Sequence, residues 1–323
     1  MDGPLHPELA LARYLPSMPL NDTWLKVYRY LVPSAKIPLE TSSPSAVVTA
    51  ELVEIPAGLT DDGNPSVPAC IVRPKSTTTT TTAKHPAILW FHGGGMVLGS
   101  HTMDLSMMKT WAQELDAVII SIEYRLAPEH KAPAAVDDAF TGWQWMVNHA
   151  VELGIDVDRL VVAGASAGGG VAATTVQRIH DSGSPIQPIL QLLVYPMLDD
   201  RTVLRFDDSV KAHVWSPKAN RYGWTSYLGC TPGNADVPAY SVAARRKDLT
   251  GLPALWIGVG TLDLFHDEDL AYAKRLEESG TRVTRFVSHG AFHAFEGLFP
   301  GSGPAKDFKQ SQVDALRAAF ASR

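Results

Sequence analysis

One stretch near the middle of the chain restricts the fold more than any other. Residues 160–163 are an apolar run that predicts a short buried strand, and residues 171–176 predict a helix. Between them lies Gly-Ala-Ser-Ala-Gly, with Ser166 at its centre. A strand that turns through Gly-x-Ser-x-Gly into a helix presents the serine hydroxyl above the end of a sheet. We therefore expect an α/β protein in which Ser166 is a candidate nucleophile.

The rest of the chain alternates between strand-like and helix-like segments. Helices of ordinary length are predicted between most of the strands, and this alternation indicates βαβ units and a mostly parallel sheet. Besides the strand before Ser166, strands are expected at residues 47–55, 69–72, 86–91, 117–122, 190–195, 254–259 and 283–287. Besides the helix after it, helices are expected at residues 103–115, 133–149, 268–279 and 308–320.

Two segments do not follow this alternation. Residues 9–15 and 24–32 predict two short helices, which are too small to fold alone and must pack on another part of the molecule. Between about residues 199 and 248 the periodicity breaks down, and aromatic and turn residues are mixed. We expect the short helices of this insertion to join the N-terminal ones in a cap.

A serine hydroxyl is a poor nucleophile unless a base removes its proton and a carboxylate orients that base. In parallel sheets, such groups lie on loops after the carboxyl ends of strands. Asp263 follows the strand at 254–259, and His293 follows the strand at 283–287. The order Ser166, Asp263, His293 is the serine–acid–histidine order of α/β-hydrolases. These three residues are the predicted catalytic set.

Each loop also offers alternatives. Asp267, Glu268 and Asp269 are expected in the first turn of the following helix, where acidic side chains interact favourably with the helix dipole. His289 precedes His293 at a spacing seen in metal sites, but no glutamate follows His289 as in a zinc-protease helix. No metal and no cofactor are therefore expected.

The segment His-Gly-Gly-Gly at 92–95 is the more specific motif. Glycines let backbone N–H groups face a substrate without interference from side chains. We expect the N–H groups of Gly93, Gly94 and Ala167 to form an oxyanion hole. A phosphate-binding loop is disfavoured because no Gly-x-x-x-x-Gly-Lys-Ser/Thr pattern occurs. His92 is expected to hold the loop by hydrogen bonds rather than to act as a base.

A second serine also matches a catalytic pattern. Ser106 and Lys109 form the Ser-x-x-Lys of penicillin-recognising enzymes. Neither Ser-Asp-Asn nor Lys-Thr-Gly follows anywhere downstream, and the segment is predicted to be an amphipathic helix. Ser106 is therefore not favoured as the nucleophile.

Charge and cysteine content exclude several classes of protein. The net charge is −6 and Lys and Arg are not clustered, so a nucleic-acid partner is not expected. Cys70 and Cys230 are the two cysteines, which favours a reducing, cytoplasmic location over a disulfide framework. No signal peptide and no run of membrane-spanning length is recognised. The sequence leaves open whether the protein is a monomer or a homo-oligomer.

Taken together, the motifs strongly resemble those of the hormone-sensitive-lipase-like family of α/β-hydrolases. The resemblance extends from about residue 47 to the C-terminus. It is carried by the segments at 92–95, 124–130 (Tyr-Arg-Leu-Ala-Pro-Glu-His) and 164–169, by Asp263, and by His-Ala-Phe at 293–295. It implies an α/β-hydrolase fold, with a mostly parallel eight-stranded sheet, helices on both faces and a helical cap. The catalytic core would be 46–199 and 246–323, with 1–45 and 200–245 as the cap.

The resemblance also implies an activity. It predicts a serine carboxylesterase without cofactor that acts on small-molecule esters with short or medium acyl chains. Ser166, Asp263 and His293 would be catalytic, with Gly93, Gly94 and Ala167 as oxyanion donors. The family usually has Asp before the nucleophile, where this chain has Ala165. That difference leaves the catalytic set intact but affects local charge. Arg125 and Glu129 are interpreted as structural.

Two other functions remain open. The same residues would also suit a hydrolase of lactones, carbamates or amides. A non-catalytic receptor on this fold is the other, and the gibberellin receptors that resemble the family lack the catalytic histidine, which here is His293. Six aromatic residues of the predicted cap either line a substrate pocket or form the cap's own core: Trp24, Tyr28, Trp215, Tyr222, Trp224 and Tyr227.

Overall fold

One eight-stranded sheet forms the centre of the molecule. The computed structural model describes residues 3–15, 19–31, 47–58, 65–75 and 84–322, and in these the strand order is β1-β2-β4-β3-β5-β6-β7-β8. β2 is antiparallel to both of its neighbours, and the strands from β4 to β8 are parallel. The strands are β1 Val48–Ile55, β2 Val67–Pro74, β3 His85–Phe91, β4 Val118–Ile122, β5 Ile155–Ala165, β6 Leu190–Val194, β7 Ala254–Gly260 and β8 Val283–Ser288.

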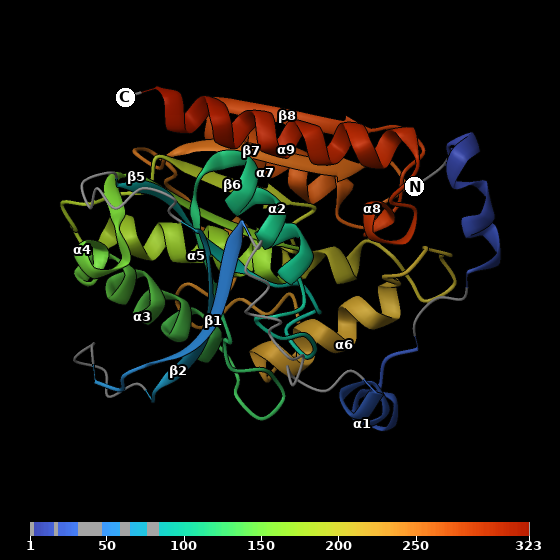
Figure 1. Ribbon diagram of the computed structural model, residues 1–323. Helices are drawn as coiled ribbons and strands as arrows, with labels where there is room; N and C mark the ends of the chain where they lie inside the picture. Colours follow the sequence, from blue (N-terminus) through green and yellow to red (C-terminus); the bar gives the residue numbers. More distant parts are fainter. Residues whose placement is uncertain (1–2, 16–18, 32–46, 59–64, 76–83, 323) are drawn as a thin grey trace.

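Helices cover both faces of this sheet (Figure 1). One core cluster joins the sheet to α3, α5 and α7, and the other joins its opposite face to α2 and α9. Consecutive residues of β3 divide between them, because side chains alternate along a strand: Leu89 belongs to the first cluster and Trp90 to the second. The helices are α2 Leu105–Leu115, α3 Ala134–Asn148, α4 Ala150–Leu153, α5 Ala167–Asp181, α7 His266–Glu278, α8 Phe295–Leu298 and α9 Gly303–Ala321.

The predicted strands and helices of the core are confirmed, with boundaries that differ by a few residues. The strand before Ser166 begins at Ile155 rather than near residue 160, and the helix after it ends at Asp181 rather than near residue 176. The first half of this strand includes Asp156, Asp158 and Arg159, so no continuous apolar run marks it. The mostly parallel eight-stranded sheet with helices on both faces is also as predicted.

The segments predicted as a cap form short elements. The N-terminal ones are η1 Pro7–Tyr14, a 3₁₀ helix, and α1 Asp22–Leu31. Those of the insertion are η2 Asp200–Leu204, α6 Pro217–Leu228 and η3 Ala243–Arg245. Tyr222 of α6 donates a hydrogen bond to Asp22 of α1, so these two helices meet as expected. Residues 32–46, which include the predicted boundary at 45 and 46, lie outside the described residues.

The first N-terminal element is also bound to the C-terminal part of the chain. The His6 N–H donates to the carbonyl of Gly290, and the Gly303 N–H at the start of α9 donates to Glu8. Leu9 belongs to the same core cluster as α9. η1 is therefore anchored on the core at its start, while Arg13 near its end lines a pocket together with residues 208–213 of the insertion.

No helix in the part of the chain that the structure describes combines the length and apolar character needed to cross a bilayer.

Candidate active site

Ser166 lies on a sharp turn between β5 and α5. Its backbone has φ 56° and ψ −120°, a conformation that non-glycine residues rarely adopt outside strained functional turns. The Ser166 N–H donates to the carbonyl of Val194 on β6, which holds the turn in place. A Cβ atom at Gly168 would lie 2.1 Å from the Phe91 carbonyl oxygen, so this position needs glycine. The Gly-x-Ser-x-Gly motif thus forms the predicted strand–turn–helix.

The side chains of Ser166, His293 and Asp263 form one series of hydrogen bonds. His293 Nε2 is 2.9 Å from Ser166 Oγ, and its Nδ1 is 2.8 Å from Asp263 Oδ2. All three residues are buried, with exposed fractions of 6%, 5% and 1% for Ser166, His293 and Asp263. Because parallel strands end at the same edge of the sheet, residues after β5, β7 and β8 meet there.

The loops that carry the acid and the imidazole are locally restrained. The Phe265 N–H donates to the second oxygen of Asp263, at 2.9 Å. The edges of two aromatic rings contact His293, with ring centroids at 4.6 Å for Tyr195 and 5.2 Å for Phe265. We did not single out either aromatic residue from the sequence. Tyr195 follows directly after β6, at the sheet edge where catalytic groups gather, and that position was the available signal.

The other acidic residues after β7 lie in the first turn of α7, as predicted, but helix-dipole interaction alone does not describe them. Asp267 is exposed, whereas Glu268 and Asp269 are buried. Glu268 accepts hydrogen bonds from the N–H groups of Leu198 and Asp199, and burial raises its pKa to about 8. Burial also raises the pKa of Asp269 well above its ordinary value. The dipole interpretation therefore needs correction, because hydrophobic periodicity does not reveal a buried carboxyl.

The remaining alternatives lie elsewhere. His289 is exposed on the turn before His293. Ser106 is on the solvent side of α2, and its carbonyl accepts a hydrogen bond from Thr110. Within the described residues, no group of three or more His, Cys, Asp and Glu side chains has the arrangement of a metal site.

The glycine loop after β3 lies against the Ser166 turn. A Cβ atom at Gly93 would be 3.4 Å from Ser166 Cβ, which shows how closely the two loops approach. Gly94 has φ 126° and its carbonyl accepts from the N–H groups of Val97 and Leu98. Neither the Gly93 nor the Gly94 N–H has an acceptor among the described residues. Ala167 begins α5, where N–H groups have no partner within the helix.

His92 is part of this loop's support, as expected. Its Nδ1–H donates to the Gly93 carbonyl at 2.8 Å, and its ring stacks on Tyr124 with centroids 4.3 Å apart. The Tyr124 hydroxyl in turn donates to the His92 carbonyl. Burial lowers the pKa of His92 to about 4, so the ring is neutral at physiological pH.

The comparisons with known proteins agree with this architecture. A family model described as the alpha/beta hydrolase fold matches residues 88–297, a span that includes the glycine loop, the Ser166 turn, Asp263 and His293. The chain belongs to the hormone-sensitive-lipase-like family of α/β-hydrolases.

Several relatives of this hydrolase have names that describe ester hydrolysis. It is 34% identical over 228 residues to Esterase LipI of Mycobacterium tuberculosis (strain ATCC 25618 / H37Rv), an alignment that covers 69% of each chain. It is 34% identical over 221 residues to Ethyl acetate hydrolase of Pseudomonas putida, covering 65% of each. Among solved structures, Bacterial Heroin Esterase superimposes with a TM-score of 0.86 at 32% identity, covering 98% of each chain.

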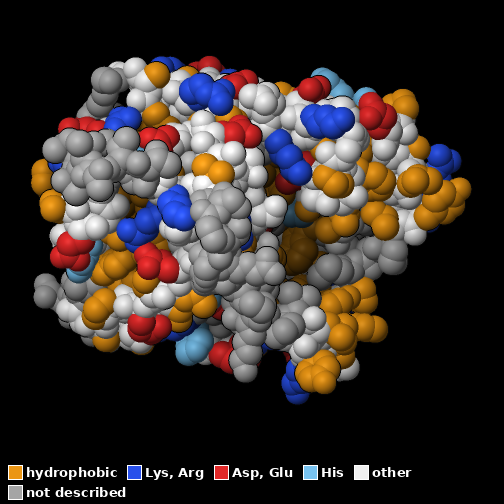
Figure 2. Space-filling model, viewed as in Figure 1, with side chains coloured by type: hydrophobic (Ala, Val, Ile, Leu, Met, Phe, Trp, Pro, Cys, Tyr) orange, Lys and Arg blue, Asp and Glu red, His pale blue; other side chains and the backbone are white. Residues whose placement is uncertain are grey.

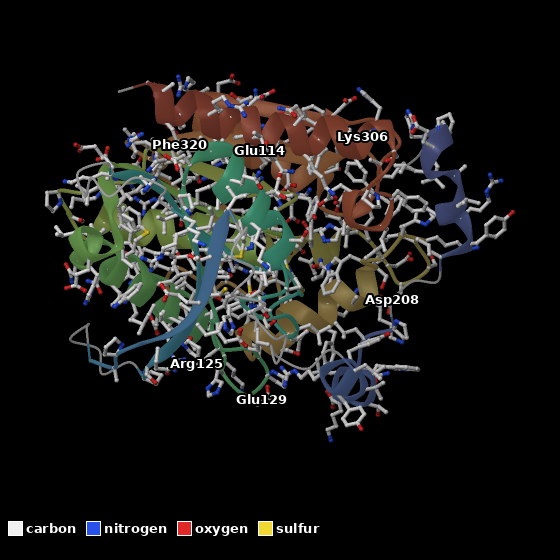
Figure 3. The ribbon with its side chains drawn as sticks, in the orientation of Figure 1. Glu114, Arg125, Glu129, Asp208, Lys306 and Phe320 are labelled. Carbon is white, nitrogen blue, oxygen red and sulfur yellow. The ribbon has the colours of Figure 1, made fainter. Side chains whose placement is uncertain are left out.

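Arg125 and Glu129 of this α/β-hydrolase, which Figure 3 labels, have the structural contacts that we expected. Arg125 binds the buried carboxylate of Asp138 on α3 through its guanidinium and its N–H. Glu129 forms an ion pair with Arg29 of α1. The Arg29 guanidinium also donates to the carbonyl of Val97, next to the glycine loop, and to the carbonyl of Ala127. One arginine thus joins α1 to the loops beside the active site.

The cap aromatics divide between the two interpretations. Trp224 and Tyr227 of α6 are buried in the core cluster that also contains α3, α5 and α7, whereas Trp24 is 43% exposed. Trp215 is buried with its ring directly on Gly95, where a Cβ atom would be 2.1 Å from the indole. Tyr28 and Tyr222 are half-buried. Figure 2 shows a hollow with hydrophobic side chains at its bottom, between α9 and α6 on this face of the hydrolase.

Proposed function

We propose that this α/β-hydrolase is a serine carboxylesterase that cleaves short- to medium-chain acyl esters through an acyl-enzyme intermediate. The observation that carries the proposal is the series of hydrogen bonds from Ser166 Oγ through His293 to Asp263. The names of its relatives support ester substrates, since they include esterases and an ethyl acetate hydrolase. The small acyl group in that last name favours the shorter end of the range.

The geometry suits a two-step acyl transfer. His293 Nε2 takes the proton from Ser166 as its oxygen attacks the ester carbonyl, and the imidazolium returns that proton to the departing alcohol. Water then attacks the acyl-serine with His293 again as base, which releases the acid and restores the serine. Asp263 accepts a hydrogen bond from Nδ1, keeps Nε2 free to act as the base, and stabilises the imidazolium.

Negative charge develops on the carbonyl oxygen in each step. The N–H groups of Gly93, Gly94 and Ala167 are the proposed donors to it, because the glycine loop lies against the Ser166 turn and α5 begins at Ala167. One such donor contributes about 3–4 kcal/mol of transition-state stabilisation in enzymes of this type.

We assign substrate selection to the segments 1–45 and 200–245, and catalysis to 46–199 and 246–323. Support comes from Trp215, which lies on Gly95 of the glycine loop, and from the contact between α1 and α6. A substrate that reaches Ser166 would pass these segments, so changes in them should alter chain-length preference before they alter the chemistry.

Hydrolysis of p-nitrophenyl acetate, butyrate, octanoate and palmitate tests the proposal. We expect the highest kcat/KM for the shorter esters, and a loss of kcat of at least roughly 10³-fold in Ser166→Ala. Ser106→Ala is the matched control and should retain full activity. A fluorophosphonate probe should add to Ser166 and to no other serine, as read by mass spectrometry of peptides.

Four outcomes would contradict the proposal in different ways. Full activity of Ser166→Ala removes Ser166 from the mechanism. Equal kcat/KM for all four esters rejects the chain-length preference. Binding of esters without turnover by the unmodified protein favours a receptor, and faster cleavage of matched lactones, carbamates or amides assigns the same residues to another hydrolase class.

A further inference from the structure

Two buried polar side chains are linked to the imidazole of His293: the Tyr195 ring contacts it, and Glu296 binds the Tyr195 hydroxyl. Tyr195 comes from the end of β6, and Glu296 belongs to α8, three residues after His293. The Tyr195 hydroxyl donates to Glu296 Oε1 at 2.5 Å. The mechanism proposed above uses neither of them.

Tyr195 is held both by its backbone and by its side chain. Its backbone N–H donates to the carbonyl of Gly258 on β7 at 2.7 Å, and its hydroxyl donates to Glu296. Between these points the ring contacts His293 with its centroid 4.6 Å away at an interplanar angle of 60°. Tyr195 also has φ 36°, a strained conformation that persists only where surrounding contacts enforce it. The contacts that enforce it also place the ring against the imidazole.

Glu296 is poorly explained as a core-filling residue. It is 9% exposed, its Oε2 has no hydrogen-bond partner among the residues that the structure describes, and burial raises its pKa. It also lines a cleft of about 690 Å³ between α2 and α9, along with Glu114 and Lys306, which Figure 3 labels. Burying a carboxyl is unfavourable unless it is hydrogen-bonded. Its one side-chain partner among the described residues is the Tyr195 hydroxyl.

We propose that Tyr195 and Glu296 act as a positioning pair for His293, in which the Tyr195–Glu296 hydrogen bond keeps the tyrosine ring against the imidazole and so keeps Nε2 aligned with Ser166 Oγ. This proposal rests on the proposed function. It assigns the pair no contact with substrate. The pair acts together with Phe265, whose ring centroid lies 5.2 Å from that of the imidazole. Asp263 remains the group that binds Nδ1.

Variants that remove or keep the hydrogen bond test the pair. Tyr195→Phe keeps the ring but loses the donor, and Glu296→Leu loses the acceptor. We expect each to lower kcat roughly 3- to 10-fold with KM unchanged, the fold-change that corresponds to losing one buried hydrogen bond. Glu296→Gln retains an acceptor oxygen and should keep kcat near that of the unmodified enzyme. The double variant Tyr195→Phe/Glu296→Leu should lose no more than either single variant, because both remove the same interaction.

Tyr272→Phe is the matched control. Its hydroxyl is also buried and hydrogen-bonded, to Gln177 on α5, but it has no contact with His293. It should lower thermal stability without lowering kcat. If Tyr195→Phe and Glu296→Leu likewise change only the melting temperature, or if Glu296→Gln is as slow as Glu296→Leu, the positioning role is wrong.

A readout without ester hydrolysis separates this proposal from the proposed function. In ¹⁵N-histidine NMR, the Nδ1–H signal of His293 should shift and exchange faster in Tyr195→Phe, and remain in place in Tyr272→Phe. An unchanged signal in Tyr195→Phe overturns the positioning role. A changed signal in a protein that hydrolyses no ester would instead uphold the pair and reject the esterase.

Discussion

Asp263 and His293 lie thirty residues apart in sequence, on loops that follow the adjacent strands β7 and β8, and their side chains meet at 2.8 Å. The Asp263 carboxylate also accepts a hydrogen bond from the Phe265 N–H, which orients it independently of the imidazole.

This contact predicts the behaviour of Asp263→Asn. The amide would place an N–H donor or a weaker acceptor next to Nδ1, which favours the wrong tautomer of His293. We expect kcat to fall roughly 10³–10⁴-fold with little change in KM. Steady-state kinetics with p-nitrophenyl butyrate measure it. Asp267→Asn is the control, because Asp267 is exposed and its side chain binds the neighbouring His266 rather than His293. Equal activity of both variants would reject the assignment of the acid.

Gly168→Ala should destabilise the fold. A Cβ atom there would be 2.1 Å from the Phe91 carbonyl oxygen at the end of β3, so the start of α5 and the end of β3 must separate. We expect about 1–3 kcal/mol lower free energy of unfolding in urea, together with lost activity. Gly301→Ala is the matched control, since a Cβ atom there meets no atom within 4 Å. Equal stability of the two variants would contradict the close packing of β3 and α5.

Glu268 predicts how stability depends on pH. Its pKa is raised from 4.5 to about 8, so between these values the folded protein holds a proton that the unfolded chain has released. The free energy of unfolding should therefore fall as pH rises through this range, by at most about 1.4 kcal/mol per pH unit for this group. Below pH 4.5 the full contribution of Glu268 to the free energy of unfolding is present.

Glu268→Gln should flatten that dependence, because the amide has no proton to lose and its oxygen still accepts from Leu198 and Asp199. Urea denaturation at several pH values measures it. Burial raises the pKa of Asp269 as well, so part of the pH dependence of stability remains in the variant. Glu278→Gln, at the exposed end of α7, should leave the slope unchanged. An unchanged slope in Glu268→Gln would mean that Glu268 is ionised in the folded protein.

The contacts of Arg29 predict an effect on substrate binding. Its guanidinium joins α1 to the carbonyls of Val97 and Ala127, which a lysine ammonium cannot all reach in the same geometry. We expect Arg29→Lys to raise KM roughly 3- to 10-fold with kcat nearly unchanged, the loss of about one charge-assisted hydrogen bond. Glu129→Gln removes only the half-exposed ion pair and should change KM less. A larger effect of Glu129→Gln would show that the ion pair, rather than the carbonyl contacts, holds α1.

The core could be predicted largely from local signals. Strands buried on both faces, such as β3 and β4, are continuous apolar runs, and glycines at the Ser166 turn and in the loop at 92–95 mark places where backbones approach closely. The η1 segment could not be placed in this way. Its anchors, Gly290 and Gly303, are at the other end of the chain, and no short-range pattern encodes a contact over that separation.

The sequence by itself determined the order of strands and helices, the turn that carries Ser166, and which loops hold Asp263 and His293. These follow from side-chain periodicity and from backbone conformations that few residues adopt, and both are local properties. Only the tertiary structure decided that Glu268 and Asp269 are buried, that Trp215 covers Gly95, and that Tyr195 contacts His293 while it binds Glu296. Such contacts depend on how distant elements pack, because burial and partner choice are set by the whole fold rather than by neighbours in the chain.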